Sequence, residues 1–533
     1  MQTLKRRFAP WEILLISVNG TIGSAWLFAP LYAAKIAGVA ALLAWVLGGG
    51  ITLLIAFTFV EIVSRVPVAG GTVRLACMTQ GLFCGYWVSW VAWLSSVTMP
   101  AIEIQAVLQY ASTYMPGLTH PEGGVEVLTG MGFLWAVVLM AVLSFINIYS
   151  FKGFRGSNWV VFGIKVGVIL LVMGVLLTTA FHPAHFSIPV SRDAWGNPSS
   201  FSWMLVLSAV ASGGVAFAFT GFKHGVEMAG EVKDPHRSIL VGIAGSVIVC
   251  LLLYLGLQVA FIGALPDGAL AEGFGALSFA HDAGPFAGLL LGLGAIWILR
   301  CLLVDAALSP LGAGLIYTTS TARMVYAMGE VGFMPRLLAA VNREGFPWIA
   351  VLLNALVGLF LFLPLPGWQA MVNFLVSAMV LSYGMGPVAL LCLRAEVGPA
   401  AQGFRVPCAK LFAFLAFYCC NLINYWTGWD TLRRLHVALL FGLIVWLGLA
   451  WRGRLAGQPW DMRAAGWLLP YIAWLWGVAY AGSFGGQQWI PFGWDLAIIA
   501  LLSALTLWSA VKLRVRGMKE VNMIDQWRGT ELL

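Results

Sequence analysis

Charged side chains are scarce in this sequence. Asp, Glu, Lys and Arg make up 10% of its 533 residues, whereas a soluble domain usually carries about 25%. Hydrophobic residues make up 60%, and one soluble core stops growing at about 250–300 residues. The composition therefore excludes an ordinary soluble globular protein and predicts a chain that folds in a lipid bilayer.

The sequence also lacks the motifs of metal, redox and hydrolytic chemistry. Its eight cysteines form no C-x-x-C pair, which is the usual spacing of redox and zinc motifs. It contains neither H-E-x-x-H nor G-x-S-x-G, the signatures of a zinc protease and of a serine hydrolase. We therefore expect no enzyme, no cofactor and no bound metal ion.

A soluble domain and a cleavable signal peptide are missing as well. The longest polar stretches are 182–200 and 265–285. The basic start Lys5-Arg6-Arg7 precedes the apolar range 11–37, which is longer than a signal-peptide core and has no small-residue cleavage site after it. We interpret this range as the first membrane span.

Long apolar stretches follow one another along the whole chain. A helix that crosses a bilayer needs about 20 apolar residues, and by that measure the sequence predicts about fourteen spans and an all-α polytopic membrane protein. The ranges are 11–37, 38–63, 81–114, 127–149, 157–181, 201–228, 238–264, 294–328, 347–365, 369–394, 408–428, 433–451, 465–484 and 491–513. The third and eighth are long enough to contain a break or a short surface helix.

Basic residues are distributed unevenly between the predicted loops. The loops after even-numbered spans carry Lys and Arg, whereas the opposite loops at 115–126, 265–285 and 366–368 carry none. Cytoplasmic loops are enriched in Lys and Arg, so we predict that both termini are cytoplasmic. The main exceptions are Arg192, Arg433 and Arg434. The net charge of +8 follows from these loops and does not indicate a nucleic-acid partner.

Glycine interrupts two predicted spans that lie five spans apart. Span 1 contains Asn19-Gly20-Thr21-Ile22-Gly23-Ser24, and span 6 contains Gly213, Gly214 and Gly221. Each glycine inside a helix costs about 1 kcal/mol relative to alanine, although glycines also serve close helix packing. Two interrupted spans in corresponding positions are expected of an inverted repeat with a substrate site at the membrane midplane.

A broken helix in lipid also predicts the kind of ligand. The freed backbone groups are tolerated only where they line a cavity or meet a ligand. Freed N–H groups favour a carboxylate, and freed carbonyls favour an ammonium group or a cation. An α-amino acid carries both groups close together, so the two breaks predict an amino acid site.

Four motifs in order resemble those of one family, the amino acid–polyamine–organocation permeases. They are Gly20-Thr21-Ile22-Gly23-Ser24; Asn147 with Lys152, Arg155, Asn158 and Lys165; Gly221-Phe222 with Glu231-Val232-Lys233-Asp234-Pro235-His236-Arg237; and Arg323-Met324-Val325-Tyr326-Ala327-Met328 with Gly332-Phe333-Met334-Pro335. The resemblance covers residues 11–395. The predicted number of fourteen spans, instead of twelve, resembles the branch of this family that contains bacterial aspartate–proton symporters.

The resemblance implies a fold and a cellular setting. Residues 11–395 are expected to form a core of five helices and five inverted helices, of the leucine-transporter type. Residues 405–513 are expected to form extra C-terminal scaffold helices, and 514–533 a cytoplasmic tail. The expected location is the bacterial inner membrane, where the partners are an amino acid, protons and the lipid bilayer. The sequence gives no indication of the oligomeric state.

The resemblance also implies the site residues. Thr21, Gly23 and Ser24 are expected to present backbone and hydroxyl groups to the substrate carboxylate, and carbonyls near Phe217, Ala218 and Thr220 to receive the amine. Phe217 stands where related exchangers have an aromatic gate, and Tyr317 where they have another aromatic pocket residue. Two positions depart from the family pattern. Ala25, followed by Trp26, replaces a glycine, and Lys223 replaces a glutamate.

Charged residues inside predicted spans are candidates for proton chemistry. Lys165 lies among apolar residues of span 5, where a charge costs several kcal/mol. A lysine that releases and regains a proton would couple transport to the proton gradient, as the resemblance also implies; the alternative is a lysine that snorkels to the interface. Glu103 in span 3 is expected to relay protons or to contact the substrate amine; the alternative is a paired structural carboxylate nearer the outer surface.

The remaining polar residues have simpler expectations. Lys223 and His224 at the span 6 break either attract an anionic side chain or, for Lys223, pair with Glu103 or Glu227. Arg300 and Asp305 are expected to pair locally. Trp11, Trp368 and Trp429 are expected in the interfacial belt, and His120, His182, His185 and His281 are expected to be solvated in outer loops.

The leading hypothesis is a proton-coupled amino acid transporter that works by alternating access. The basic pair Lys223 and His224 favours an acidic substrate such as aspartate or glutamate. One alternative is an exchanger that swaps an amino acid for its decarboxylated amine. Another is a nutrient receptor that does not transport, but such a receptor normally carries a soluble signalling domain, and the tail at 514–533 is too short to provide one.

Overall fold

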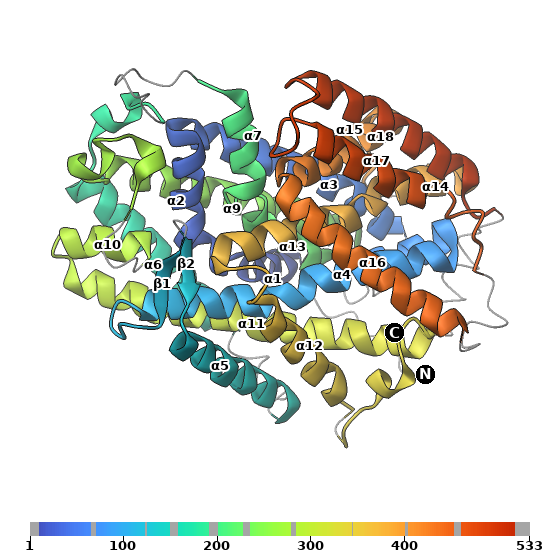
Figure 1. The fold of residues 1–533 in the computed structure, drawn as a ribbon, viewed down its shortest axis with the longest axis horizontal. Helices are drawn as coiled ribbons and strands as arrows, with labels where there is room; N and C mark the ends of the chain where they lie inside the picture. Colours follow the sequence, from blue (N-terminus) through green and yellow to red (C-terminus); the bar gives the residue numbers. More distant parts are fainter. Residues whose placement is uncertain are drawn as a thin grey trace.

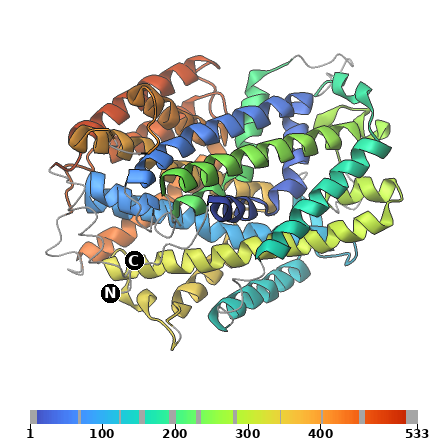
Figure 2. The ribbon, with the colours of Figure 1, turned by 180° about the vertical axis from the view of Figure 1, so that it is seen from behind.

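The structure is a computed structural model in which helices dominate. It describes residues 10–65, 71–122, 125–149, 158–190, 201–227, 235–278, 284–343, 345–399, 403–451 and 460–516. Figures 1 and 2 show one continuous assembly of packed helices from the two sides. The predicted basic segments Lys5-Arg6-Arg7, Lys152–Arg155 and 517–533, the motif residues Glu231–Asp234, and His281 lie outside the described residues.

Each of the fourteen predicted ranges contains a helix or a broken helix. The α-helices of the described residues are α1 (Pro10–Thr21), α2 (Ala25–Ala37), α3 (Ala41–Arg65), α4 (Gly71–Ala111), α5 (Gly130–Tyr149), α6 (Asn158–Thr179), α7 (Trp203–Ser212), α8 (Phe222–Glu227), α9 (Pro235–Gly263), α10 (Pro285–Gly292), α11 (Ile296–Val331), α12 (Trp348–Leu361), α13 (Gly367–Tyr383), α14 (Met385–Val397), α15 (Ala409–Trp426), α16 (Trp429–Trp451), α17 (Leu468–Ala481) and α18 (Trp494–Leu513).

The number of membrane crossings is lower by a strict test of length and composition. Within the described residues, nine helical stretches are long and apolar enough to cross a membrane, or ten if the bent pair α7–α8 counts as one. The helices α12 and α17 are apolar but only 14 residues long. A polytopic membrane protein is therefore confirmed, and the count of fourteen stays a prediction.

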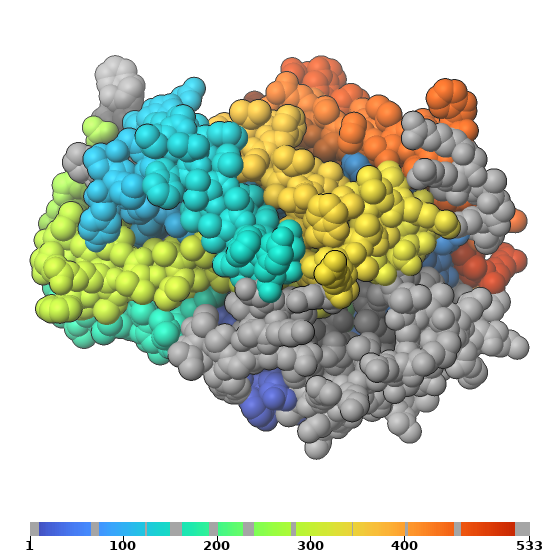
Figure 3. Space-filling model, turned by 90° about the horizontal axis from the view of Figure 1, so that it is seen from below, coloured from blue at the N-terminus to red at the C-terminus, as the bar shows by residue number. Residues whose placement is uncertain are grey.

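The outer surface of the bundle suits a lipid solvent. Helix α16 exposes Val437, Leu440, Phe441 and Ile444, each at 59–64% of its surface. Water would penalise such a stripe by about 25 cal/mol for each Å² of apolar area, whereas acyl chains do not. Figure 3 shows α5 and α12 side by side on another face of the bundle.

Two of the helices are interrupted where glycine predicted it. The first span divides into α1 and α2 at Ile22–Ser24, and the sixth divides into α7 and α8 with a 52° bend. Gly214 takes a φ of +81° in the second break, a conformation that residues with a Cβ rarely adopt. Helix α4 is kinked at Gly81, which has a φ of 80° and is the first residue of the third range, so the rest of that range is one helix through Pro100. The eighth is one helix through Pro310.

The two broken helices lie at the centre of the bundle. Figure 2 shows α1 nearly end-on in the middle, between α9 and the long α4 and α11. Helix α2 packs against α7, and α1 packs against α8 and α9. This packing brings residues near 20 and residues near 220 together in the interior.

A β-hairpin is the exception to the predicted all-α fold. Strands β1 (Thr119–Glu122) and β2 (Val125–Leu128) pair antiparallel in the range expected to be a plain loop. The hairpin packs against the start of α13, where Gly367 has a φ of +74° and a Cβ would lie 3.0 Å from the Glu126 carbonyl oxygen. It therefore fixes the chain just before Trp368.

The C-terminal helices are joined to one another by buried polar side chains. Tyr425 donates to the Asp495 carboxylate at 2.6 Å. Tyr471 donates to Asn421 at 2.7 Å, and Asn421 donates to Ser503 at 2.8 Å. In Figure 1 these orange and red helices gather at one end, and α15 packs on α3, α13 and α14.

Candidate functional site

The two chain breaks touch each other. A Cβ at Gly221 would collide with the backbone of Thr21, and one at Gly20 would collide with the His224 ring. Tyr254 donates its hydroxyl to the Thr21 carbonyl at 3.3 Å, and Tyr383 donates to the Thr220 carbonyl at 3.4 Å. Glycine thus lets two broken helices approach at backbone distance, while tyrosines from α9 and α13 satisfy carbonyls at the breaks.

The first break receives a lysine from α6. Lys165 is 1% exposed, and its ammonium donates to the Ile22 carbonyl at 2.9 Å and to the Ser309 carbonyl of α11 at 3.4 Å. A snorkelling lysine would reach toward the interface, so the structure contradicts that alternative. The Lys165 ammonium therefore lies at a backbone carbonyl of the break.

A carboxylate from α4 lies on the other side of the same break. Glu103 is fully buried, and its Oε2 accepts a hydrogen bond from the Ser24 N–H at 2.9 Å. A Cβ at Gly23 would lie 2.6 Å from Glu103 Oε1, so a side chain at this position would displace the carboxylate. Oε1 is buried and accepts no hydrogen bond from any residue that the structure describes. The N–H that begins α2 therefore holds an internal carboxylate.

Trp368 closes the site from α13. Its indole N–H donates to the Ser24 hydroxyl at 2.9 Å, and its ring stacks on Tyr32 and contacts Phe28 and Phe217 with centroids 5.3–5.7 Å apart. The side chain is fully buried, so the prediction of an interfacial tryptophan is wrong here. Trp11, by contrast, is 51% exposed.

The structure brings most of the predicted site residues into one buried cluster. Thr21, Ser24, Ala25, Phe217, Ala218, Thr220 and Tyr317 are each exposed by 6% or less. Tyr317 meets the His224 ring edge to face at 5.1 Å. The Thr21 hydroxyl, however, donates to the Ser17 carbonyl at 2.6 Å. Thr21 therefore contributes its backbone to the site while its hydroxyl is engaged within α1.

Lys223 has a position at the edge of this cluster. It is half-buried, and its ammonium reaches the Ser96 hydroxyl of α4 at 3.5 Å. The side chain of Glu227, one of its expected partners, is not described, and the other, Glu103, binds Ser24 instead. The Lys223 ammonium therefore lies near the break. Its partner Ser96 is about two turns of α4 away from Glu103.

Two further expectations are wrong. Arg300 is exposed and lies over the Trp297 ring at 5.2 Å, whereas Asp305 is fully buried and accepts from the Ser309 hydroxyl. His185 is 2% exposed and contacts the Asp267 carboxylate at 2.8 Å. That hydrogen bond holds the pKa of Asp267 below its usual range.

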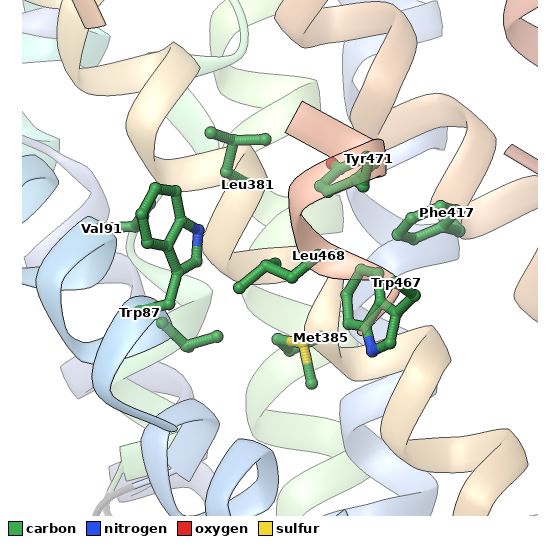
Figure 4. Close-up of a pocket in the computed structure, with 10 residues that line it drawn as sticks. Trp87, Val91, Leu381, Met385, Phe417, Trp467, Leu468 and Tyr471 are labelled. Atoms are coloured by element: carbon green, nitrogen blue, oxygen red, sulfur yellow. The ribbon is translucent and has the colours of Figure 1, made fainter. Parts of the chain in front are cut away.

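A small apolar cavity elsewhere in the bundle is not the site. It lies between α4, α13, α14, α15 and α17, and its walls are apolar or aromatic, as Figure 4 shows for Trp87, Met385 and Phe417. None of its lining residues is charged. A zwitterion needs charged or backbone partners, so this pocket suits no amino acid.

Sequence reasoning missed Trp368, Tyr254 and Asp305 as residues of the site. Trp368 and Tyr254 gave no signal because aromatic residues are common in apolar spans. Asp305 did give one, since an aspartate within an apolar run is costly; the nearby Arg300 suggested a local pair instead.

Comparisons with known proteins identify the family and several relatives of this chain. The family model described as amino acid permease matches residues 8–429. The glutamate/serine transporter AimA of Bacillus subtilis (strain 168) is 32% identical over 510 residues, which cover 94% of this chain and 93% of that protein. The aspartate-proton symporter of the same strain is 31% identical, with 94% and 95% covered. The branched-chain amino acid permease BcaP is 25% identical, with 84% and 93% covered.

Proposed function

The chain belongs to the amino acid permease family, and from that premise we propose that it takes up an acidic amino acid together with protons, by alternating access across the bacterial cell membrane. The observation that carries the proposal is the Lys165 ammonium on the Ile22 carbonyl, at the break of the first span. The names of two relatives, a glutamate/serine transporter and an aspartate-proton symporter, support an acidic substrate.

The core is proposed to be an inverted repeat. The breaks in α1–α2 and α7–α8 lie five spans apart and meet at the centre, as expected of two repeats related across the membrane plane. Residues 11–395 would form the two repeats, 405–513 the scaffold and 514–533 a tail, with both termini in the cytoplasm by the distribution of basic residues.

The substrate carboxylate is proposed to bind at Gly23 and Ser24. Ser24 is the residue just before the first residue of α2. Its N–H has no acceptor within the helix and lies at the positive end of the helix dipole. Glu103 satisfies this N–H in the buried arrangement. Arrival of a substrate carboxylate would displace Glu103, which could then receive the substrate amine together with the carbonyls near Phe217, Ala218 and Thr220.

Phe217, Trp368 and Tyr317 are proposed to close over the bound amino acid. Phe217 and Trp368 meet edge to face with centroids 5.7 Å apart, and Ala25 and Trp26 narrow the neighbouring turn of α2. Opening on one side requires that at least one of these contacts separate. Because the cluster is buried throughout, the arrangement corresponds to an occluded state of an alternating-access cycle.

Uptake into proteoliposomes tests the function. The purified protein should accumulate labelled aspartate or glutamate when the outside is more acidic, and much less when the pH is equal on both sides. A panel of neutral and basic amino acids provides the comparison. Strict dependence on an internal amine would favour the exchanger, and binding without flux would favour a receptor; either result contradicts the proposal.

Replacing Lys223 by glutamine is expected to weaken the preference for acidic substrates. Lys223 stands near the break on the Ser96 side, and an exposed or half-buried charge pair contributes up to about 1 kcal/mol. The apparent KM for aspartate should therefore rise by about fivefold, while uptake of a neutral amino acid such as serine stays unchanged. Lys410→Gln on the exposed surface of α15 is the matched control. An unchanged ratio of aspartate to serine uptake would show that Lys223 has no part in selectivity.

A further inference from the structure

Two carboxyl side chains and one lysine are buried around the first break. Glu103, Lys165 and Asp305 come from α4, α6 and α11, and each is exposed by 1% or less. If all three are charged, their net charge is −1. An uncompensated charge inside a protein is expensive. If one of the two carboxylates binds a proton while Lys165 stays charged, the group becomes neutral. The charge balance therefore favours a proton on one of the two carboxyl groups.

Ser309 connects the lysine to one of the two carboxylates. Its backbone carbonyl accepts from the Lys165 ammonium at 3.4 Å. Its hydroxyl donates to Asp305 Oδ1 at 2.9 Å and Oδ2 at 3.0 Å. Among the described residues no ion pair within 4.0 Å joins Asp305 directly to Lys165, so a proton would have to pass between them through an intermediate group.

We propose that Asp305 receives the proton that Lys165 releases, so that the coupling site of this transporter is the pair Lys165 and Asp305 bridged at Ser309. This inference rests on the proposed function. In the step, an N–H bond of the Lys165 ammonium breaks and an O–H bond forms on the Asp305 carboxylate, through the Ser309 hydroxyl or one water. Ammonium and carboxylate become amine and carboxylic acid, and both buried charges disappear together.

The other titratable groups at the break are placed for different tasks. Glu103 lies on the far side of Gly23 and already binds the Ser24 N–H, where the substrate carboxylate is proposed to arrive. Tyr254 of α9 donates to the Thr21 carbonyl, and His224 of α8 faces Gly20 and Tyr317. Cys250 of α9 lies next to Thr21. Asp305 is thus the carboxylate that shares a bridging residue with Lys165, and within the described residues it forms no hydrogen bond with the proposed substrate groups.

The position of Asp305 also suits a route for the proton. Asp305 lies nine residues into α11, one turn before Ser309, on the side toward the helix start at Ile296. The predicted loop that precedes α11 is an outer one. A proton held on Asp305 would therefore lie between Lys165 and the outside, so it could reload the lysine when the outer path opens.

Asp305→Asn tests the proposal because asparagine keeps the shape and the acceptor for Ser309. With one proton per substrate, a pH difference of one unit sustains about tenfold accumulation. The unaltered protein should reach that ratio in proteoliposomes whose membrane potential is clamped. The Asp305→Asn variant should equilibrate near a ratio of about one, while counterflow of labelled against unlabelled aspartate stays within about twofold.

Two further variants separate proton transfer from packing. Ser309→Ala keeps the backbone carbonyl under Lys165 and the Asp305 carboxylate but removes the bridging hydroxyl, so it should reach the same accumulation ratio more slowly. Asp305→Glu restores a proton acceptor and should recover accumulation with a displaced pH profile. Accumulation by Asp305→Asn equal to that of the unaltered protein would overturn the proposal. So would equal loss of accumulation and counterflow in Asp305→Asn and Asp305→Glu, since this would indicate packing alone.

The outcomes for this pair and for the proposed function are distinguishable. If the unaltered protein accumulates no amino acid under a pH gradient, the proposed function fails before Asp305 is tested. If it accumulates substrate and Asp305→Asn does so equally well, only the assignment of Asp305 fails. Measurement of the unaltered protein therefore comes first.

Discussion

Lys165→Ala is expected to abolish proton-driven accumulation of the amino acid. The substitution removes the ammonium that donates to the Ile22 carbonyl at 2.9 Å and to the Ser309 carbonyl at 3.4 Å. It also leaves Glu103 and Asp305 as buried carboxylates without their nearest positive charge. Removing one partner from a buried charge group typically costs about 3–5 kcal/mol, so both carboxylates are expected to take up protons and hold them through the cycle.

The measurement is uptake of labelled aspartate into proteoliposomes with and without a pH gradient. The variant should equilibrate but not accumulate substrate, a loss of about tenfold under a gradient of one pH unit. Lys512→Ala is the matched control, because Lys512 is exposed and lies over the Trp508 ring at 4.6 Å. Full accumulation by Lys165→Ala would remove the lysine from the coupling mechanism.

Some parts of the site could be predicted because their signals are local in the sequence. Glycines inside apolar runs mark the breaks at Gly23 and Gly214, since lipid offers no other partner for freed backbone groups. Lys165 is visible for the same reason, as an isolated charge in an apolar span. Both kinds of residue violate the pattern of a plain lipid-facing helix, and such violations are expected at functional sites.

Other parts depend on contacts that no local pattern encodes. Trp368 lies 344 positions from Ser24, to which its indole donates. In the sequence it follows a proline and a glycine at the start of a span, which is also where interfacial tryptophans occur. In the structure the hairpin β1–β2 packs against the start of α13 and fixes the chain just before this tryptophan. Asp305 was likewise assigned to Arg300, although the helix directs the two side chains to different faces.

Helix boundaries and crossings were also only partly predictable. Hydrophobic length located a helix in each of the fourteen ranges, but it could not separate a crossing helix from a shorter packed one such as α12 or α17. Polar contacts such as Tyr471 to Asn421 join the C-terminal helices to one another. In the sequence these residues are scattered single polar positions, and their pairing follows from tertiary packing.

Gly221→Ala is expected to stop transport by forcing the two broken helices apart. The added Cβ would collide with the backbone of Thr21, lying 2.6 Å from its Cα. Backbone cannot rotate away as a flexible side chain can, so overpacking of about 1–3 kcal/mol is expected. A shift of about 1 Å at a site that positions its ligand can reduce the rate by about a hundredfold. Aspartate uptake should therefore fall far more than the amount of folded protein.

The control for Gly221→Ala is the same substitution where a helix has room. Gly448 in α16 has no atom within 4 Å of the position of a Cβ, and alanine is favoured over glycine in a helix by about 1 kcal/mol. Gly448→Ala should therefore transport normally and unfold at the same or a higher temperature. If Gly221→Ala also transported normally, a small separation of α1 and α8 would be enough to accommodate the added Cβ beside Thr21. The close approach of the two breaks would then be a packing feature and not a requirement for binding the amino acid.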